Sequence, residues 1–61
     1  MMTPTQAMTA SLTMMTDAEV HYVLAYCDGE VRRCAENSAA MDKFEARRLA
    51  AERELTNRRN R

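Results

Sequence analysis

The sequence is poor in residues that end helices or build turns. It contains one glycine and one proline, and it has no tryptophan. Gly and Pro are the strongest local interruptions of regular structure, so their scarcity leaves little turn chemistry. The common residues are instead the strong helix formers alanine, glutamate, arginine, leucine and methionine. The composition therefore predicts an all-α protein.

Large core side chains are also scarce. The aromatic residues are two tyrosines and one phenylalanine in a chain of 61 residues. A chain of about 60 residues buries only roughly 60% of its unfolded surface, so it is marginally stable by itself. Natural proteins of this size usually add disulfides, a metal or a partner subunit. We therefore expect self-association, with a homodimer as the simplest closed form.

Positive charge is missing from the first half of the chain. Residues 1–30 contain four acidic residues and no Lys or Arg, whereas residues 31–61 contain nine basic and five acidic residues. The formal net charge is zero. Such a division can orient the pairing of chains or attract a partner to one end. It is not the strongly basic composition of a typical nucleic-acid-binding protein.

Long apolar runs are absent. No stretch approaches the roughly 20 residues that a membrane-spanning helix needs. The beginning of the sequence also lacks the charged and apolar regions of a signal peptide. The sequence therefore predicts a cytoplasmic protein that makes no membrane contact.

The first fifteen residues carry no charge and several threonines, which are weak helix formers. We therefore expect residues 1–15 to form a flexible N-terminal tail. The alternative is a short helix, in which Thr3 and Gln6 form a capping box and Pro4 lies in the first turn.

The ordered part is expected to begin at Thr16. Thr16 and Glu19 have the spacing of a capping box, in which each side chain accepts a hydrogen bond from the backbone of the other residue. Gly29 can supply the left-handed conformation that ends many helices. The pattern therefore predicts a short helix over about 16–28 and a long helix over about 30–56.

Two architectures fit this pattern. In the first, a helical hairpin domain over residues 16–57 is followed by a basic C-terminal end at residues 58–61. In the second, one long helix forms a coiled coil with apolar residues in steps of three and four. Charged residues occupy several seam positions in its second half, and Gly29 favours the hairpin. Two such hairpins would pair into a helical bundle.

Two sets of residues are predicted to make contacts. The seam that forms the core or the dimer interface comprises Val20, Val23, Leu24, Cys27, Val31, Cys34, Met41 and Leu49. The candidate surface for a different partner comprises Tyr22, Tyr26, Phe44, Arg47 and Arg48. Tyrosine and arginine are enriched at protein–protein interfaces, and this supports the second set.

No catalytic, cofactor-binding or metal-binding site is predicted. His21 is the only imidazole, and metal sites need more ligands at tighter spacing than Cys27 and Cys34 offer. The two cysteines are expected to act as small apolar residues, with a disulfide between chains as the alternative. The sequence therefore predicts a protein that is not an enzyme and has no cofactor.

Nucleic-acid binding is the rival hypothesis. It would use the arginines of the second half of the chain: Arg47, Arg48, Arg53, Arg58, Arg59 and Arg61. Acidic residues are interleaved with most of these arginines, as on an ordinary solvated helix face. Protein binding is therefore the favoured hypothesis.

The chain resembles the very small helical accessory proteins encoded in the early regions of lambdoid temperate bacteriophages. The resemblance lies in the start MMTPTQAMTASLTMMTDAEV, in the run MDKFEARRLAAERELTNRRNR, and in the small size. It implies a non-enzymatic regulator that binds a host or phage protein and biases the choice between lysis and lysogeny. It assigns no functional residues.

Overall fold

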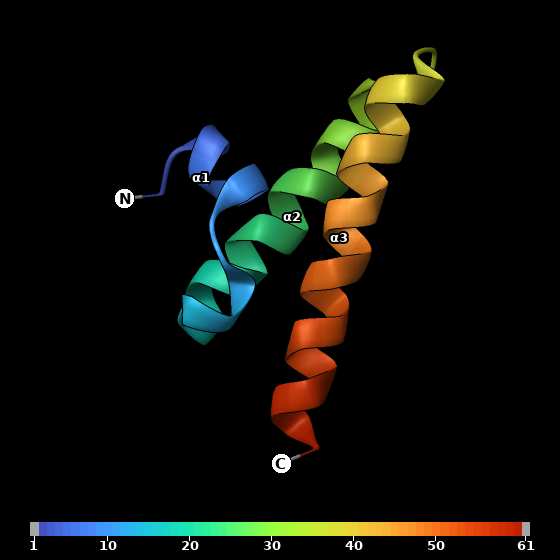
Figure 1. Cartoon of the computed structure of the whole chain (residues 1–61). Coiled ribbons are helices and arrows are strands. Elements are labelled where there is room, and N and C mark those ends of the chain that lie inside the picture. The colour runs from blue at the N-terminus through green and yellow to red at the C-terminus, as the bar shows by residue number, and fades with distance from the viewer. Residues whose placement is uncertain (1, 61) are drawn as a thin grey trace.

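The computed structural model describes residues 2–60. It contains the α-helices α1 (Pro4–Thr9), α2 (Asp17–Arg33) and α3 (Ser38–Arg59), and a 3₁₀-helix η1 (Leu12–Met14). Helices α2 and α3 pack against each other as a hairpin, while α1 packs on α2 and η1 on α3 (Figure 1). The predicted all-α helical hairpin is confirmed.

The start of α2 is built as its sequence predicts. The Glu19 amide donates a hydrogen bond to Thr16 Oγ1 at 3.2 Å, and the Thr16 amide donates to Glu19 Oε1 at 2.8 Å. Asp17 and Glu19 lie in the first turn of α2, and Arg32 and Arg33 lie in its last turn. Acidic and basic residues at these respective ends stabilise the helix dipole.

The predicted break at Gly29 is wrong. Helix α2 continues through Gly29 to Arg33, and Gly29 does not have a positive φ. One glycine costs about 1 kcal/mol in a helix interior. Packing of α2 against α3 outweighs this cost, because tertiary contacts supply most of the stability of helices in proteins.

The chain reverses after α2 instead. The Cys34 backbone leaves the helical conformation at φ −98° and ψ 21°. Asn37 then caps α3, because its side chain accepts a hydrogen bond from the Ala40 amide at 3.2 Å. The long helix therefore begins at Ser38 instead of residue 30. It also continues to Arg59, into the predicted basic end, while Arg61 lies outside the described residues.

Replacing Gly29 with alanine is expected to stabilise the protein by about 1 kcal/mol. Gly29 is exposed, and a Cβ atom built there meets nothing within 4 Å. Urea unfolding followed by circular dichroism measures the change, and Ala46→Gly on the exposed side of α3 should lose a similar amount. A less stable Gly29→Ala protein would contradict the continuous helix.

The N-terminal residues differ from the expected flexible tail. The structure has the capped alternative: the Thr3 amide donates to Gln6 Oε1 at 2.9 Å, and the Gln6 amide donates to Thr3 Oγ1 at 3.2 Å. Ala7 is completely buried and Met15 is 8% exposed. We call residues 3–15 the N-terminal cover, because they pack onto both α2 and α3.

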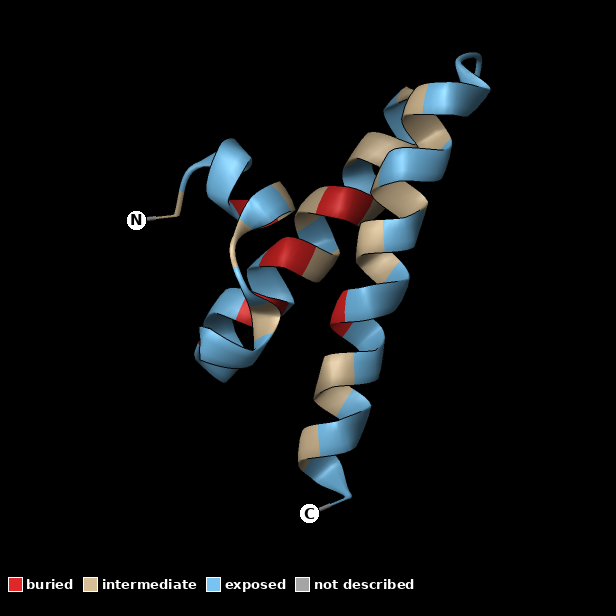
Figure 2. Cartoon of the chain, in the orientation of Figure 1, coloured by how far each residue is buried: buried red, intermediate tan, exposed pale blue. Residues whose placement is uncertain are grey.

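The core is small and includes the N-terminal cover. Figure 2 shows its few buried residues in red, between the cover, α2 and α3. The buried residues are Ala7, Met15, Val20, Val23, Cys27 and Ala51. Three members of the predicted seam are therefore in the core.

The other predicted seam residues lie nearer the surface. Four are half-buried: Leu24, Val31, Cys34 and Met41. Leu49 is 47% exposed, so it lies outside the core of the single chain, and a place at a dimer interface stays a prediction. The inward side of α3 is instead the side of Ala51, which is completely buried. Residues two apart on a helix lie about 200° apart, so Leu49 points away from that side.

The chain exposes more surface than a compact protein of its size. Its accessible surface is 4387 Å² for a mass of 7.0 kDa. A compact monomer of this mass would expose about 4,000 Å². The Cα positions span 38 × 25 × 14 Å, so the molecule is also thin in one direction. The hairpin is therefore less compact than an average monomer of its mass.

Candidate interaction surfaces

Arg47 fastens the first part of the N-terminal cover to α3. Its Nε atom donates a hydrogen bond to the Ala7 carbonyl at 2.8 Å, and its Nη2 atom donates to the Ala10 carbonyl. These carbonyls lie near the C-terminal end of α1, where helix carbonyls lack partners within the helix. The predicted partner-surface residue Arg47 therefore binds a segment of its own chain.

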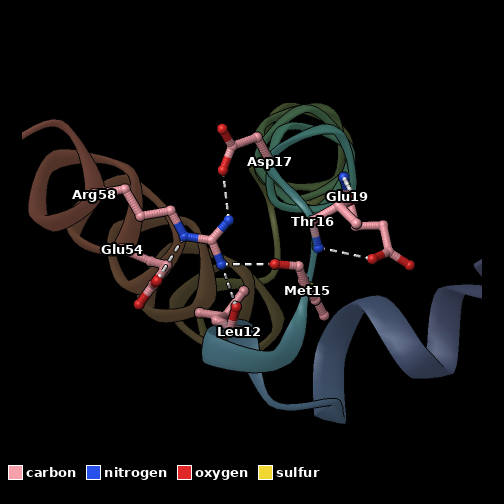
Figure 3. A network of polar contacts seen from close by, with 7 residues as sticks. All are labelled: Leu12, Met15, Thr16, Asp17, Glu19, Glu54 and Arg58. Carbon is pink, nitrogen blue, oxygen red and sulfur yellow. Dashed lines mark hydrogen bonds and ion pairs between the residues drawn. The ribbon is translucent and has the colours of Figure 1, made fainter.

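Arg58 fastens the second part of the cover. Its Nη2 atom donates to the carbonyls of Leu12 at 3.0 Å and Met15 at 2.7 Å (Figure 3). The same guanidinium pairs with Asp17 at 2.6 Å and with Glu54 at 2.7 Å. Hydrogen bonds to Glu54 and Asp17 raise the pKa of Arg58 above its ordinary value, so it remains a cation. Arg58 thereby links the cover, α2 and α3.

Arg48 has a different role from its neighbour. It pairs with Glu45 at 2.9 Å and with Glu52 at 2.7 Å, both within α3. Exposed pairs of this kind within a helix contribute about 0.5 kcal/mol or less. Arg48 also lines a groove between α2 and α3. The structure therefore separates Arg47 and Arg48, which the sequence placed on one partner surface.

The three aromatic residues of the predicted partner surface come together. The rings of Tyr22 and Tyr26 stack with centroids 6.3 Å apart, and the Phe44 ring meets Tyr26 edge-on at 6.0 Å. Tyr22 is 41% exposed. Beside Tyr26 and Phe44, residues of α1 and Lys43 line a shallow groove. We call Tyr22, Tyr26 and Phe44 the aromatic cluster.

The other side of α2 borders a second groove, which we call the open face. It is lined by His21, Leu24, Ala25, Asp28, Arg48 and Glu52. An adjoining hollow shares His21 and adds Asp17, Leu55, Arg58 and Arg59. Leu24 and Leu55 supply apolar surface, and charged residues of both signs surround them. Because Tyr22 and Leu24 are about 200° apart on α2, the open face and the aromatic cluster lie on nearly opposite sides.

The cysteines and His21 form neither a metal-binding group nor a disulfide among the residues that the structure describes. Residues 2–60 contain no group of three His, Cys, Asp or Glu side chains that could hold a metal. Cys27 and Cys34 are not bonded to each other, and Cys27 is buried. Burial raises the pKa of the Cys27 thiol, while nearby Arg47 and Arg48 lower it. A disulfide between chains could therefore use only Cys34 without opening the core.

Most arginines described by the structure already have acidic or carbonyl partners. Besides the contacts of Arg47, Arg48 and Arg58, Arg32 pairs with Asp28 at 3.3 Å and Arg33 pairs with Glu30 at 2.8 Å. Phosphate binding would have to compete with these partners.

Sequence reasoning missed several residues that organise these surfaces. Ala7 and Ala51 are buried, and Arg58 was assigned to a separate basic end. The spacing of Glu54 and Arg58 at i and i+4 was one signal that the helix includes Arg58, because such pairs stabilise a helix.

Comparisons with known proteins return no relative. No protein-family model matches the chain, and no curated protein or solved structure matches it significantly. Within residues 2–60, the helices are too short or too polar to cross a membrane.

Proposed function

We propose that this protein is a non-enzymatic interaction module that forms a homodimer through its open face and binds a further protein. The observation that carries this proposal is the apolar surface of Leu24 between α2 and α3, in a chain whose accessible surface of 4387 Å² exceeds that of a compact monomer. Domains normally bury such faces against a second layer of helices.

The charges of the open face are complementary to those of a second copy of the chain. On that face and in the adjoining hollow, α2 contributes Asp17 and Asp28, while α3 contributes three arginines and one acid: Arg48, Arg58, Arg59 and Glu52. In a twofold dimer each residue meets its partner reciprocally. An antiparallel arrangement can therefore set the acidic edge of α2 against the basic edge of the other α3. Two hairpins joined in this way make a four-helix bundle.

The aromatic cluster is the proposed site for a different protein. Aromatic side chains supply large contact areas at interfaces, and Tyr22 already has 41% of its surface exposed. Lys43 lies beside the cluster and favours an acidic neighbour. The resemblance to early-region phage proteins supports a host or phage protein as the target, and a role in biasing lysis against lysogeny.

Leu24→Asp is expected to weaken the dimer at least about 100-fold while the hairpin stays folded. The reason is that association would bury a carboxylate without a partner, whereas in the monomer Leu24 is only half-buried. Sedimentation over a range of protein concentrations measures the dissociation constant, and circular dichroism checks helicity. Ala39→Asp on the exposed side of α3 is the control and should leave the dimer unchanged.

The same experiment can reject the proposal. A wild-type chain that stays monomeric at every concentration, or a Leu24→Asp chain that stays dimeric, would exclude the open-face dimer. Copurifying nucleic acid that dissociates steeply with rising salt would favour the rival hypothesis, because counterion release makes such complexes strongly salt-dependent.

A further inference from the structure

The N-terminal cover is fastened by its backbone. Its four anchoring groups are carbonyls, which accept hydrogen bonds from two arginines of α3: Ala7 and Ala10 from Arg47, and Leu12 and Met15 from Arg58. Any peptide in the same conformation presents these carbonyls, so the anchors do not depend on its side chains. The two arginines therefore recognise the backbone conformation of the cover.

Side chains of the cover give the site its selectivity. Ala7 fits a place with no exposed surface, and the Cys27 thiol lies 3.7 Å from the Met8 sulfur. Met15 joins the same cluster, whose floor is formed by α2 residues including Val23. No residue from 3 to 15 carries a charged side chain. The groove thus fits an uncharged segment with a small residue followed by methionine.

The cover is joined to α2 at a point that can act as a hinge. Met15 and Thr16 are both extended, with φ −86° and ψ 153° for Met15 and φ −71° and ψ 164° for Thr16. Helix α2 is capped by Thr16 and Glu19, which do not belong to the cover. Rotation at this junction can therefore release the cover while the first turn of α2 keeps its cap.

We propose that the groove beneath residues 3–15 is a peptide-binding site, and that the N-terminal cover of a second copy can occupy it in exchange for the chain's own cover. The second copy is the occupant because its cover has the sequence that fits the groove in this structure. Exchange of an identical element is a low-cost route to association. The anchor Arg58 also lines the hollow beside the open face, but Arg47, Val23 and Cys27 line neither. A chain can therefore exchange covers whether or not the open face dimerises.

Two complementary full-length variants test the exchange. The acceptor carries Ala7→Glu, which prevents its own cover from docking, and Cys34→Ser, which leaves Cys27 as the only thiol. The donor carries Arg47→Ala, which loosens its cover, with Cys27→Ala and Cys34→Ser to remove its thiols. The rate at which a thiol reagent modifies Cys27 then reports only on the groove of the acceptor.

The cover controls that rate in two ways. It shields Cys27, which has no exposed surface, and burial raises the pKa of the thiol. Thiolate is the reactive form, so uncovering the residue increases both its access and its reactivity. We expect the acceptor to react at least about tenfold faster than the Cys34→Ser parent. The reason is that its cover is undocked, and Cys27 therefore exposed, in a larger fraction of the molecules.

Excess donor is expected to slow the acceptor's reaction by at least about fivefold, in proportion to donor concentration. A donor that also carries Ala7→Glu should give no protection. Adding Leu24→Asp to both chains should leave the exchange unchanged, which separates this result from failure of the open-face dimer.

Three results would overturn the proposal. The first is an acceptor that stays helical and reactive at every donor concentration. The second is an acceptor that reacts as slowly as the parent, because Ala7 would then not seal the groove. The third is an acceptor that loses its helicity, because the cover would then be an inseparable part of the fold.

Discussion

Replacing Val23 with aspartate is expected to unfold the protein. Val23 lies in the middle of α2, has no exposed surface, and belongs to the one cluster of buried residues. A buried carboxylate without a partner costs about 3–5 kcal/mol. At typical values per residue, the whole free energy of unfolding of a chain this short is about 3–9 kcal/mol. Circular dichroism should therefore show a large loss of helix at 25 °C.

Ala18→Asp is the matched control for this substitution. It adds the same charge to the same helix, but Ala18 is exposed and lies in the first turn of α2. A negative charge there interacts favourably with the helix dipole. We expect the control to unfold at or slightly above the wild-type midpoint. A Val23→Asp protein that melts like wild type would show that this cluster is not the core.

The starts of α1 and α2 were predictable because capping is local. Thr16 and Glu19 are three residues apart, and the pair Thr3 and Gln6 repeats the same arrangement. A hydrogen bond over this distance needs no information from the rest of the chain. Even so, the threonines of residues 1–15 favour a flexible tail over the capped helix, because the burial of Ala7 that stabilises the helix depends on contacts with distant residues.

The position of Gly29 did not predict where the chain turns between α2 and α3. Gly29 was the best candidate for a break, yet the chain turns between Cys34 and Asn37, where there is no glycine or proline. Asn37 was the available signal, because asparagine is a preferred N-cap residue. Local preferences of about 1 kcal/mol decide where a helix ends only if the alternative ends allow equally good tertiary packing.

Sequence periodicity could not predict that two arginines of α3 bind the N-terminal cover. Arg47 and Ala7 are 40 positions apart, and Arg58 and Met15 are 43 positions apart. The acceptors are backbone carbonyls, which every residue possesses, so no residue pattern marks them. Long arginine side chains can also pack their stems along an apolar face while the charged group finds a partner.

These arginines explain why the wrong side of α3 was assigned to the seam. We sought a stripe of apolar residues, and Leu49 was the largest candidate in its middle. The inward side instead combines the small Ala51 with Arg47 and Arg58, whose guanidinium groups are satisfied by the cover. A hydrophobicity pattern assigns arginine positions to the exposed side of a helix. It therefore predicts the wrong orientation of α3 about its axis.

Aspartate at position 51 and aspartate at position 49 are expected to have opposite consequences. Ala51 has no exposed surface, so Ala51→Asp should cost about 3 kcal/mol or more by burying an unpaired charge. Leu49 is 47% exposed, so Leu49→Asp should change the free energy of unfolding by less than about 0.5 kcal/mol. Urea unfolding of both variants, at a protein concentration where sedimentation shows monomer, measures the difference.

This pair decides between the two orientations of α3, because each substitution is the control for the other. If the seam predicted from the sequence were correct, Leu49→Asp would be the destabilising change and Ala51→Asp would be tolerated. Equal, large losses for both variants would mean that α3 is enclosed on both sides within the monomer.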